Sequence, residues 1–225
     1  MKNLDGSITL SAMSPNDLKN LIQTGEGLYL EFKRTTPSPE KIAREIGAFA
    51  NTRGGTILVG VDDDKTISGI RSWFEEEFLM EKAADEFCVP AVGITMEMVH
   101  LPDRDVMVVL VPESKQKPVY NRGKRIRQVF VRRGEESVLA SGEQVEVLRK
   151  QTSQEGVSFE YGEKERLLFR YLNEYGEITV EGYSRLINAT THRASGILVN
   201  LVGAGVLSLS SRKNVDYFTF SHQMK

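Results

Sequence analysis

The chain of 225 residues is 40% hydrophobic and 27% charged, which is ordinary for a globular protein of one or two domains. No apolar run approaches the length of a membrane span, and residues 1–5 do not begin a signal peptide, so we expect a cytoplasmic protein without a membrane segment. Cys88 is the only cysteine, which excludes a disulfide framework and a thiolate zinc site.

The charges are unevenly distributed, although the net charge is only −2. Residues 71–113 contain three basic and ten acidic residues, whereas residues 114–134 contain eight basic residues and no acidic one. A local excess of one sign attracts ligands of the opposite sign. The second segment therefore predicts an anion-binding face.

The first elements along the chain predict a strand and a buried helix. Residues 28–34 alternate between apolar and polar side chains, so Glu31 and Lys33 point to the same face of a strand. Ser38 and Pro39 are typical of a helix start. Apolar residues then recur at helical spacing and predict one buried face, made of Ile42, Ile46, Phe49 and Ala50.

The turn after this helix contains two consecutive glycines, which allow positive φ and the close approach of another group. Two interpretations stay open, a phosphate-binding nest of backbone amides and a tight helix-to-strand turn. The residues of the turn are Asn51, Thr52, Arg53, Gly54 and Gly55. The spacing of a P-loop is absent. Residues 56–61 predict a strand buried on both faces, and residues 66–70 a return strand.

The following segments predict further elements and a linker. Residues 73–87 indicate an amphipathic helix whose buried stripe contains Trp73, Phe74, Phe78, Leu79 and Ala83. Residues 94–101 and 106–111 indicate a hairpin, and residues 128–132 another strand. Residues 151–162 are polar with two glycines and predict a linker. Three short helices and a β-hairpin follow it.

The segments LYLEFKR at 28–34 and AFANTRGGTILVGVDDD at 48–64 together resemble the AlbA-like domain of Schlafen-type proteins. The resemblance implies an α/β (α+β) fold with a mixed sheet and flanking helices over residues 1–152. Residues 160–225 resemble a small winged helix-turn-helix domain. Both resemblances imply nucleic-acid binding, with DNA as the favoured partner and RNA as the alternative.

The same resemblance implies catalytic residues if the chain is a nuclease. Some Schlafen-type nucleases carry an E-x4-E-x-K segment and a later aspartate, and the matching residues here are Glu26, Glu31, Lys33 and Asp62, with Asp63 as a second choice for the aspartate. Glu26, Glu31 and Asp62 would then hold Mg²⁺ or Mn²⁺, and Lys33 would meet phosphate charge. The alternative is that Glu31 and Lys33 are exposed strand partners and that Asp62 belongs to an ordinary turn.

Two groups of residues are candidates for nucleic-acid contacts. In the basic segment, the residues predicted to contact phosphates are Lys124, Arg125, Arg127, Arg132 and Arg133. In the C-terminal part, Thr190, Thr191 and Arg193 begin the third helix, where a recognition helix reads bases, and Arg212 and Lys213 occupy the tip of the hairpin.

We therefore expect a DNA-binding protein that acts as a transcriptional regulator. The alternative is a Schlafen-type metal-dependent endoribonuclease that acts on structured RNA such as tRNA. A third interpretation is a protein-interaction module, because winged helices also mediate the formation of homodimers. The sequence leaves open whether the chain is an enzyme.

Overall fold

A computed structural model describes residues 13–123, 126–152, 159 and 161–221. The chain divides into two compact units, Met1–Leu139 and Ala140–Lys225. The division falls earlier than the boundary at 152–160 that the sequence predicts. Helix α4 (Gly142–Gln151) packs against α7 (Thr191–Gly203), which places it in the second unit. Within the described residues, no helix combines the length and apolar character that a membrane span requires.

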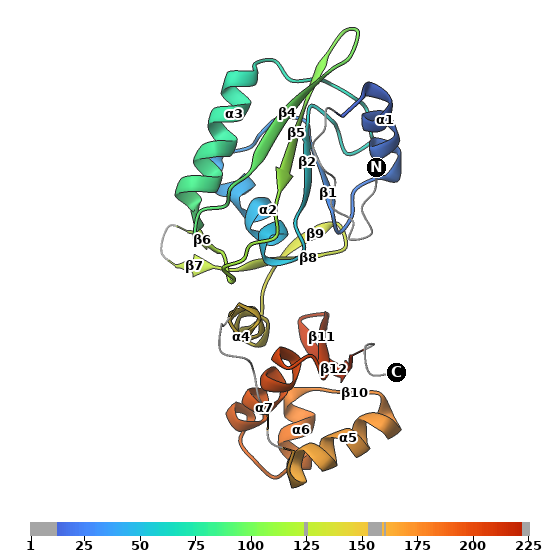
Figure 1. Ribbon diagram of the computed structural model, residues 1–225, viewed down its shortest axis with the longest axis vertical. Coiled ribbons are helices and arrows are strands. Elements are labelled where there is room, and N and C mark those ends of the chain that lie inside the picture. Colours follow the sequence, from blue (N-terminus) through green and yellow to red (C-terminus); the bar gives the residue numbers. More distant parts are fainter. Residues whose placement is uncertain (1–12, 124–125, 153–158, 160, 222–225) are drawn as a thin grey trace. The chain divides into compact units, whose positions relative to one another are not determined.

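A four-stranded mixed sheet forms the centre of the first unit (Figure 1). Its order is β1 (Leu30–Lys33), β2 (Gly55–Val59), β5 (Asp105–Val111) and β4 (Thr95–His100). Strand β1 is parallel to β2, and the other neighbours are antiparallel. The mixed sheet and its flanking helices confirm the α/β (α+β) fold class.

Helices cover both faces of this sheet. Helix α2 (Pro39–Asn51) buries its apolar side chains against Ile57 and Val59 of β2. On the other face, α1 (Pro15–Thr24) packs with Leu58 of β2. Successive side chains of a strand point to opposite faces, so the continuous apolar run of β2 follows from its coverage on both sides. The prediction of a strand buried on both faces is confirmed.

Local sequence sets the helix starts. Ser14 Oγ accepts a hydrogen bond from the Asp17 backbone N–H at 3.2 Å, and the Asp17 carboxylate accepts one from the Ser14 N–H at 3.3 Å. This capping box satisfies amides that the first turn of α1 leaves unpaired. Helix α2 begins instead with Pro39 at its first position, which loses no helical hydrogen bond there.

Several short elements complete the first unit. A three-stranded sheet contains β3 (Cys88–Val89), β6 (Tyr120–Arg122) and β7 (Arg127–Gln128), and β8 (Phe130–Arg133) pairs with β9 (Glu136–Leu139). The single strand expected at 128–132 is therefore divided between two small sheets. The return strand expected at 66–70 is reduced to one bridge between Val61 and Ile67.

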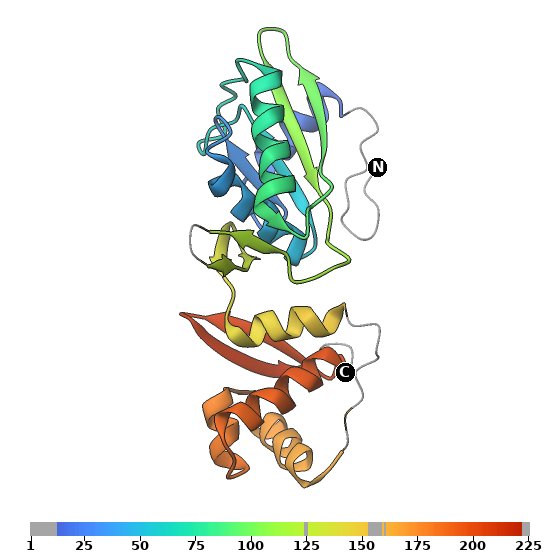
Figure 2. The same ribbon diagram turned by 90° about the vertical axis from the view of Figure 1, so that its left-hand side faces the viewer.

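The acidic segment forms α3 (Trp73–Lys82) and a π-helical turn, η1 (Ala83–Phe87), on the same face of the sheet as α2. Figure 2 shows α3 in front of the sheet. Phe74 and Phe78 are 80% and 61% exposed, so the prediction that they are buried is wrong. Ala83 of the same predicted stripe is buried, as is Met80, which lies outside it, because the face that meets the core is rotated from the predicted one.

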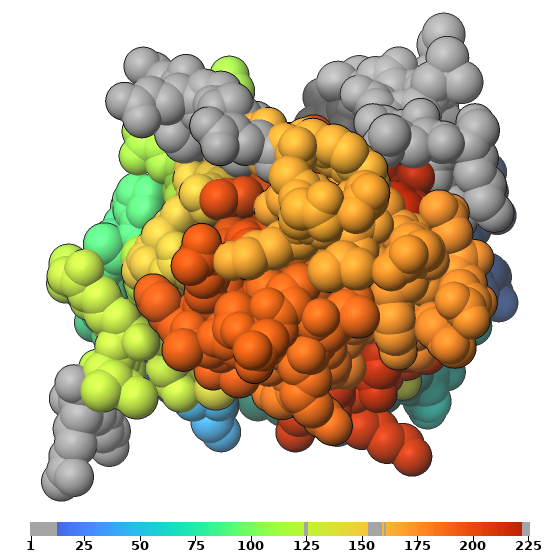
Figure 3. Space-filling view, turned by 90° about the horizontal axis from the view of Figure 1, so that it is seen from below, coloured from blue at the N-terminus to red at the C-terminus, as the bar shows by residue number. Residues whose placement is uncertain are grey.

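The second unit continues after α4 with three helices and a sheet. These are α5 (Glu163–Tyr175), α6 (Val180–Leu186), α7, and an antiparallel sheet of β10 (Glu177–Ile178), β12 (Val215–Phe220) and β11 (Leu207–Arg212). Its core contains Leu168, Leu172, Tyr183, Leu198 and Phe218. Figure 3 views this unit from the side on which α5 and α6 lie.

Candidate functional site

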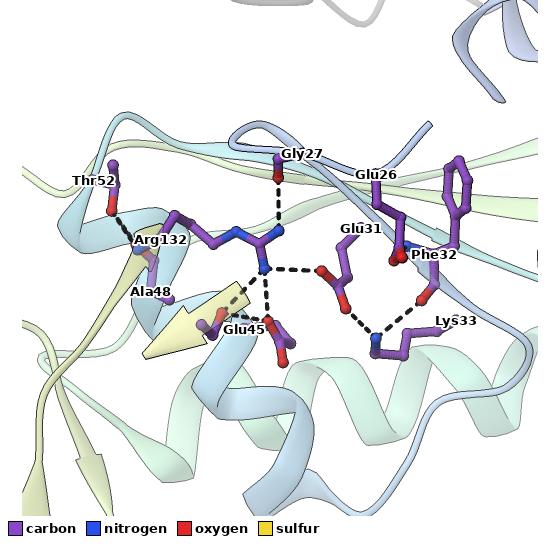
Figure 4. Close-up of polar contacts among 10 residues, drawn as sticks. Glu26, Gly27, Glu31, Phe32, Lys33, Glu45, Ala48, Thr52 and Arg132 are labelled. Atoms are coloured by element: carbon purple, nitrogen blue, oxygen red, sulfur yellow. Dashed lines mark hydrogen bonds and ion pairs between the residues drawn. The ribbon is translucent and has the colours of Figure 1, made fainter. Parts of the chain in front are cut away.

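Arg132 is the centre of a buried polar network in the first unit (Figure 4). Its side chain has 0% exposed area. Nη1 donates hydrogen bonds to Glu31 Oε2 at 2.8 Å and to Glu45 Oε2 at 3.0 Å. Nη2 donates to the carbonyl oxygen of Gly27 at 2.7 Å, and the guanidinium carbon lies 4.6 Å from the centre of the Phe49 ring. Arg132 is thus a buried counter-ion, whereas the sequence predicts a cation that contacts phosphate.

Three parts of the fold bring this network together. Strand β1 carries Glu31, α2 carries Glu45, and the paired strands β8 and β9 carry Arg132 and Ser137. Ser137 Oγ lies 3.2 Å from Arg132 Nη1 and also contacts the Glu45 carboxylate. The backbone N–H of Arg132 donates to Thr52 Oγ1 at 3.0 Å, which fixes β8 at the end of α2. Sequence reasoning missed Glu45 and Ser137, because neither belongs to a local motif.

Glu31 is occupied on both carboxylate oxygens. Oε2 accepts from Arg132, and Oε1 contacts the ammonium group of Lys33, which also donates to the Phe32 carbonyl at 3.0 Å. Only 6% of Glu31 is exposed. The interpretation of Glu31 as an exposed strand residue is therefore wrong, because Arg132 and Glu45 lie against that face of β1.

The other two predicted carboxylates also have donors or cations beside them. Glu26 Oε1 accepts a hydrogen bond from the Phe32 backbone N–H at 2.8 Å. Burial raises the pKa of the Glu26 carboxyl above its ordinary value, and the Phe32 hydrogen bond opposes that shift. Asp62 Oδ1 lies 3.7 Å from Nε of Arg34, which is largely exposed. This surface pair contributes little to stability.

Divalent metal ions such as Mg²⁺ require oxygen ligands that converge on one point. Among the residues that the structure describes, no group of three or more His, Cys, Asp or Glu side chains is placed to hold a metal ion. The Glu31 oxygens already meet Arg132 and Lys33. In this arrangement, Glu26, Glu31 and Asp62 do not fit the metal site that the Schlafen resemblance implies.

Asn51 fastens two distant segments to the end of α2. Its side chain is 2% exposed. Oδ1 accepts from the Val119 N–H at 2.7 Å, and Nδ2 donates to the carbonyls of Val119 and Phe130, both at 2.9 Å. A buried amide that meets three backbone groups is a structural clamp, since leaving any of these groups unpaired would cost free energy.

The rest of the glycine turn also serves the fold. The backbone N–H groups of Thr52 and Gly54 both donate to the Phe49 carbonyl, at 3.0 and 2.9 Å. Gly54 has φ of +70°, and a Cβ there would lie 2.6 Å from the Val111 carbonyl oxygen. A Cβ on Gly55 would lie 2.3 Å from the Phe49 ring. These contacts favour the tight turn over the phosphate nest, and they leave Arg53 exposed at its outer side.

Strands β6 and β7 present an exposed pair of cations. We call the described residues of these two strands and their ends, 120–123 and 126–128, the basic hairpin. Arg122 lies directly opposite Arg127 in the antiparallel register, and both side chains are exposed. Within the described part of the chain, neither guanidinium has a carboxylate partner. Lys124 and Arg125 lie outside the described residues, and Arg133 is half-buried on β8.

The N-terminus of α7 is the exposed part of that helix. Thr190 is its N-cap, and Thr190 Oγ1 accepts the Arg193 backbone N–H at 3.3 Å. Thr191 and Arg193 are exposed, as is Gly196 one turn further on. A Cβ on Gly196 would meet no atom within 4 Å. The predicted reading residues therefore lie on an open surface of the second unit.

The tip of the β11–β12 hairpin holds Arg212 and Lys213. Arg212 forms an ion pair with Glu177, and its guanidinium carbon lies 4.1 Å from the centre of the Tyr217 ring. Lys213 and Asn214 have φ of 49° and 62°, as a two-residue hairpin turn requires. Arg212 is thus positioned by its neighbours, and Lys213 is exposed at the turn.

Residues 26–141 match the family model described as Schlafen, AlbA_2, and the chain belongs to this family. No curated protein matches the chain. Solved structures that resemble it include the N-terminal domain of a RecG-related protein from Nitrosomonas europaea, with 23% identity and a TM-score of 0.44 over 53% of this chain and 88% of that one. A protein from Corynebacterium diphtheriae has 14% identity and a TM-score of 0.42 over 57% of this chain and 28% of its own.

Proposed function

We propose that the chain is a cytoplasmic nucleic-acid-binding protein that holds the phosphates of DNA on its basic hairpin. The observation that carries the proposal is the pair of Arg122 and Arg127. Like charges directly opposite each other destabilise a pair of strands. An anionic backbone that lies across both guanidinium groups removes this repulsion and releases counterions. Membership of the Schlafen AlbA_2 family supports the same function.

The second unit supports DNA over RNA. After α4, its elements follow the order α5, β10, α6, α7, β11 and β12, which is the order of a winged helix-turn-helix. In that interpretation, α7 is the recognition helix and enters the major groove of a duplex. Arg193 is placed to reach guanine, and Lys213 to reach the neighbouring backbone. A protein that reads duplex DNA in this way acts as a transcriptional regulator.

The buried network favours binding over cutting. A metal-dependent nuclease of Schlafen type would need Glu31 as a metal ligand. Here Glu31 pairs with Arg132, and its removal would leave the buried cation with only one of its two carboxylate partners. The endoribonuclease alternative therefore requires a rearrangement of β8 against β1, whereas binding requires none.

The full chain should be titrated with labelled duplex DNA and with labelled tRNA, with and without Mn²⁺. We expect DNA binding without cleavage, and a weaker, less salt-dependent complex for the double variant Arg122→Ala/Arg127→Ala. Each lost phosphate contact lowers the salt slope by about one, so the double variant should lose about two. Arg71→Ala is the matched control, because Arg71 is also exposed but lies in the acidic segment.

The result that would overturn the proposal is equal affinity and equal salt slope for the parent and the double variant. Cleavage of tRNA that depends on Mn²⁺ and disappears in Glu31→Gln would instead support the endoribonuclease. Light scattering of the complex would show whether one or two chains bind each duplex.

A further inference from the structure

Ile126 is an apolar residue at the tip of the basic hairpin, and 68% of it is exposed. It lies directly before Arg127, which faces Arg122 across the strands. The more exposed Phe74 stands on α3 beside the exposed Glu75. The surroundings of these two exposed apolar residues therefore differ in charge. A polyanion is attracted to Ile126 and its neighbours and is repelled from the surface that contains Phe74.

The strands below Ile126 are firmly attached to the core. Asn121 is 4% exposed, and its Nδ2 donates to the Ala43 carbonyl at 2.6 Å. Gly47 makes room for it, since a Cβ on Gly47 would lie 2.5 Å from Asn121 Oδ1. Two residues before Asn121, the backbone of Val119 is held by hydrogen bonds to the Asn51 side chain. An exposed tip on a fixed base loses little conformational freedom on binding.

Ile126 lies close to the end of β6. The Gly123 N–H donates to the Ile126 carbonyl at 3.2 Å. A Cβ on Gly123 would lie 2.7 Å from that oxygen, so the close approach requires glycine. No described residue covers the side chain of Ile126, and the core does not use it. Leaving this apolar side chain in water costs free energy, and no packing contact in the first unit explains why an apolar residue stands there.

We propose that Ile126 is a wedge that enters the minor groove of duplex DNA and partly unstacks one base step, while Arg122 and Arg127 hold the flanking phosphates. This inference rests on the proposed function and adds the form of DNA and the mode of contact. Apolar side chains between cations kink duplexes in this way, and the energy of unstacking is recovered by contacts to the bent backbone. Flexible steps such as TA should be preferred over stiff A-tracts.

The test is a measurement of DNA bending by energy transfer between dyes at the two ends of a duplex of about 20–30 base pairs with a central TA step. The full chain should raise the transfer efficiency at saturation. Ile126→Ala should bind with the salt slope of the parent but lose the increase in transfer. Ile126→Met should restore it, because methionine is an apolar side chain of similar size. Phe78→Ala is the control for an exposed apolar residue outside the hairpin, and it should bend DNA like the parent.

The possible failures are distinguishable. If the parent binds duplex DNA with no increase in transfer, or if Ile126→Ala bends it equally, the wedge is excluded and the proposed function stands. If the parent binds no duplex at saturating concentration, both the proposed function and the wedge are excluded.

Discussion

Arg132 Nη1 lies 2.8 Å from Glu31 Oε2, although 101 positions separate the two residues in the sequence. The pair joins the first strand of the central sheet to β8, and neither side chain is more than 8% exposed. Glu45 supplies a second carboxylate to the same nitrogen. A cation removed from water in this way is tolerated because Nη1 and Nη2 donate to acceptors, although Nε is buried without a hydrogen-bond partner among the described residues.

Arg132→Met should destabilise the first unit by about 3–5 kcal/mol, because the buried carboxylates lose their counter-ion. Denaturant unfolding followed by circular dichroism measures this change. The double variant Arg132→Met/Glu31→Gln should recover part of the loss, since it removes charge from both sides. If the two single changes simply add, Arg132 and Glu31 are not coupled and the assignment of the pair is wrong.

Cys88 should be inert in the folded chain. Burial raises the pKa of its thiol to about 12, and Sγ lies 3.7 Å from the Ala43 carbonyl oxygen. The thiolate is the reactive form, so a thiol reagent at about pH 8 meets almost none of it. We expect no labelling of the native protein and complete labelling of its single thiol after unfolding in guanidinium. Rapid labelling without denaturant would show that the contact between β3 and α2 opens readily.

Glu26→Gln should alter how stability depends on pH. The pKa of Glu26 is raised in the folded state, so its contribution to stability is fully present below the unfolded pKa near 4.5 and is lost as the pH rises through the folded pKa. Relative to the parent, the glutamine variant should therefore become more stable between about pH 4 and pH 7. Its side-chain oxygen can still accept the Phe32 N–H. Unfolding curves at both ends of this range measure the difference, and the opposite sign would mean that burial does not control this carboxyl.

Gly196→Ala should change stability and DNA affinity in opposite directions. Glycine inside a helix costs about 1 kcal/mol relative to alanine, and a Cβ here meets open space, so the second unit should gain about that much. If α7 lies against DNA, the same methyl group should weaken binding. Thermal unfolding and DNA titration of the full chain test the two effects. Unchanged affinity would indicate that the exposed face of α7 does not touch the duplex.

The elements that were predicted correctly depend on local patterns. The apolar spacing of α2 predicts one buried face, and the continuous apolar run of β2 predicts burial on both faces. The structure confirms both predictions. The position of Arg132 could not be predicted in this way. Its burial depends on Glu31 and Glu45, which meet it only after the chain has folded. Alternate side chains within residues 124–132 would share one face of a strand. This pattern does not indicate which residues of other elements lie against that face.

The exposed residues of α3 show a second limit of prediction from the sequence. Phe74 and Phe78 have the spacing of a buried stripe, yet both are exposed, whereas Ala83 of the same stripe and Met80 outside it meet the core. Several faces of this helix carry apolar residues, so periodicity alone does not select one. In the sequence, Ile126 is distinguished only by its place in the run Lys124–Arg127. A count of charged residues therefore finds the basic segment but does not identify the apolar residue within it.

The clamp from Asn51 to Val119 and Phe130 has a consequence for synthesis of the chain. Helix α2 and strands β1 and β2 leave the ribosome first, but the residues that close the unit around them follow much later. Contacts between such distant residues require the closure of long loops, which slows folding. The nascent chain therefore lacks the hydrogen bonds that close the unit at the end of α2 until β8 has emerged. During that interval the first unit is incompletely folded, and apolar surface exposed in such a species promotes aggregation.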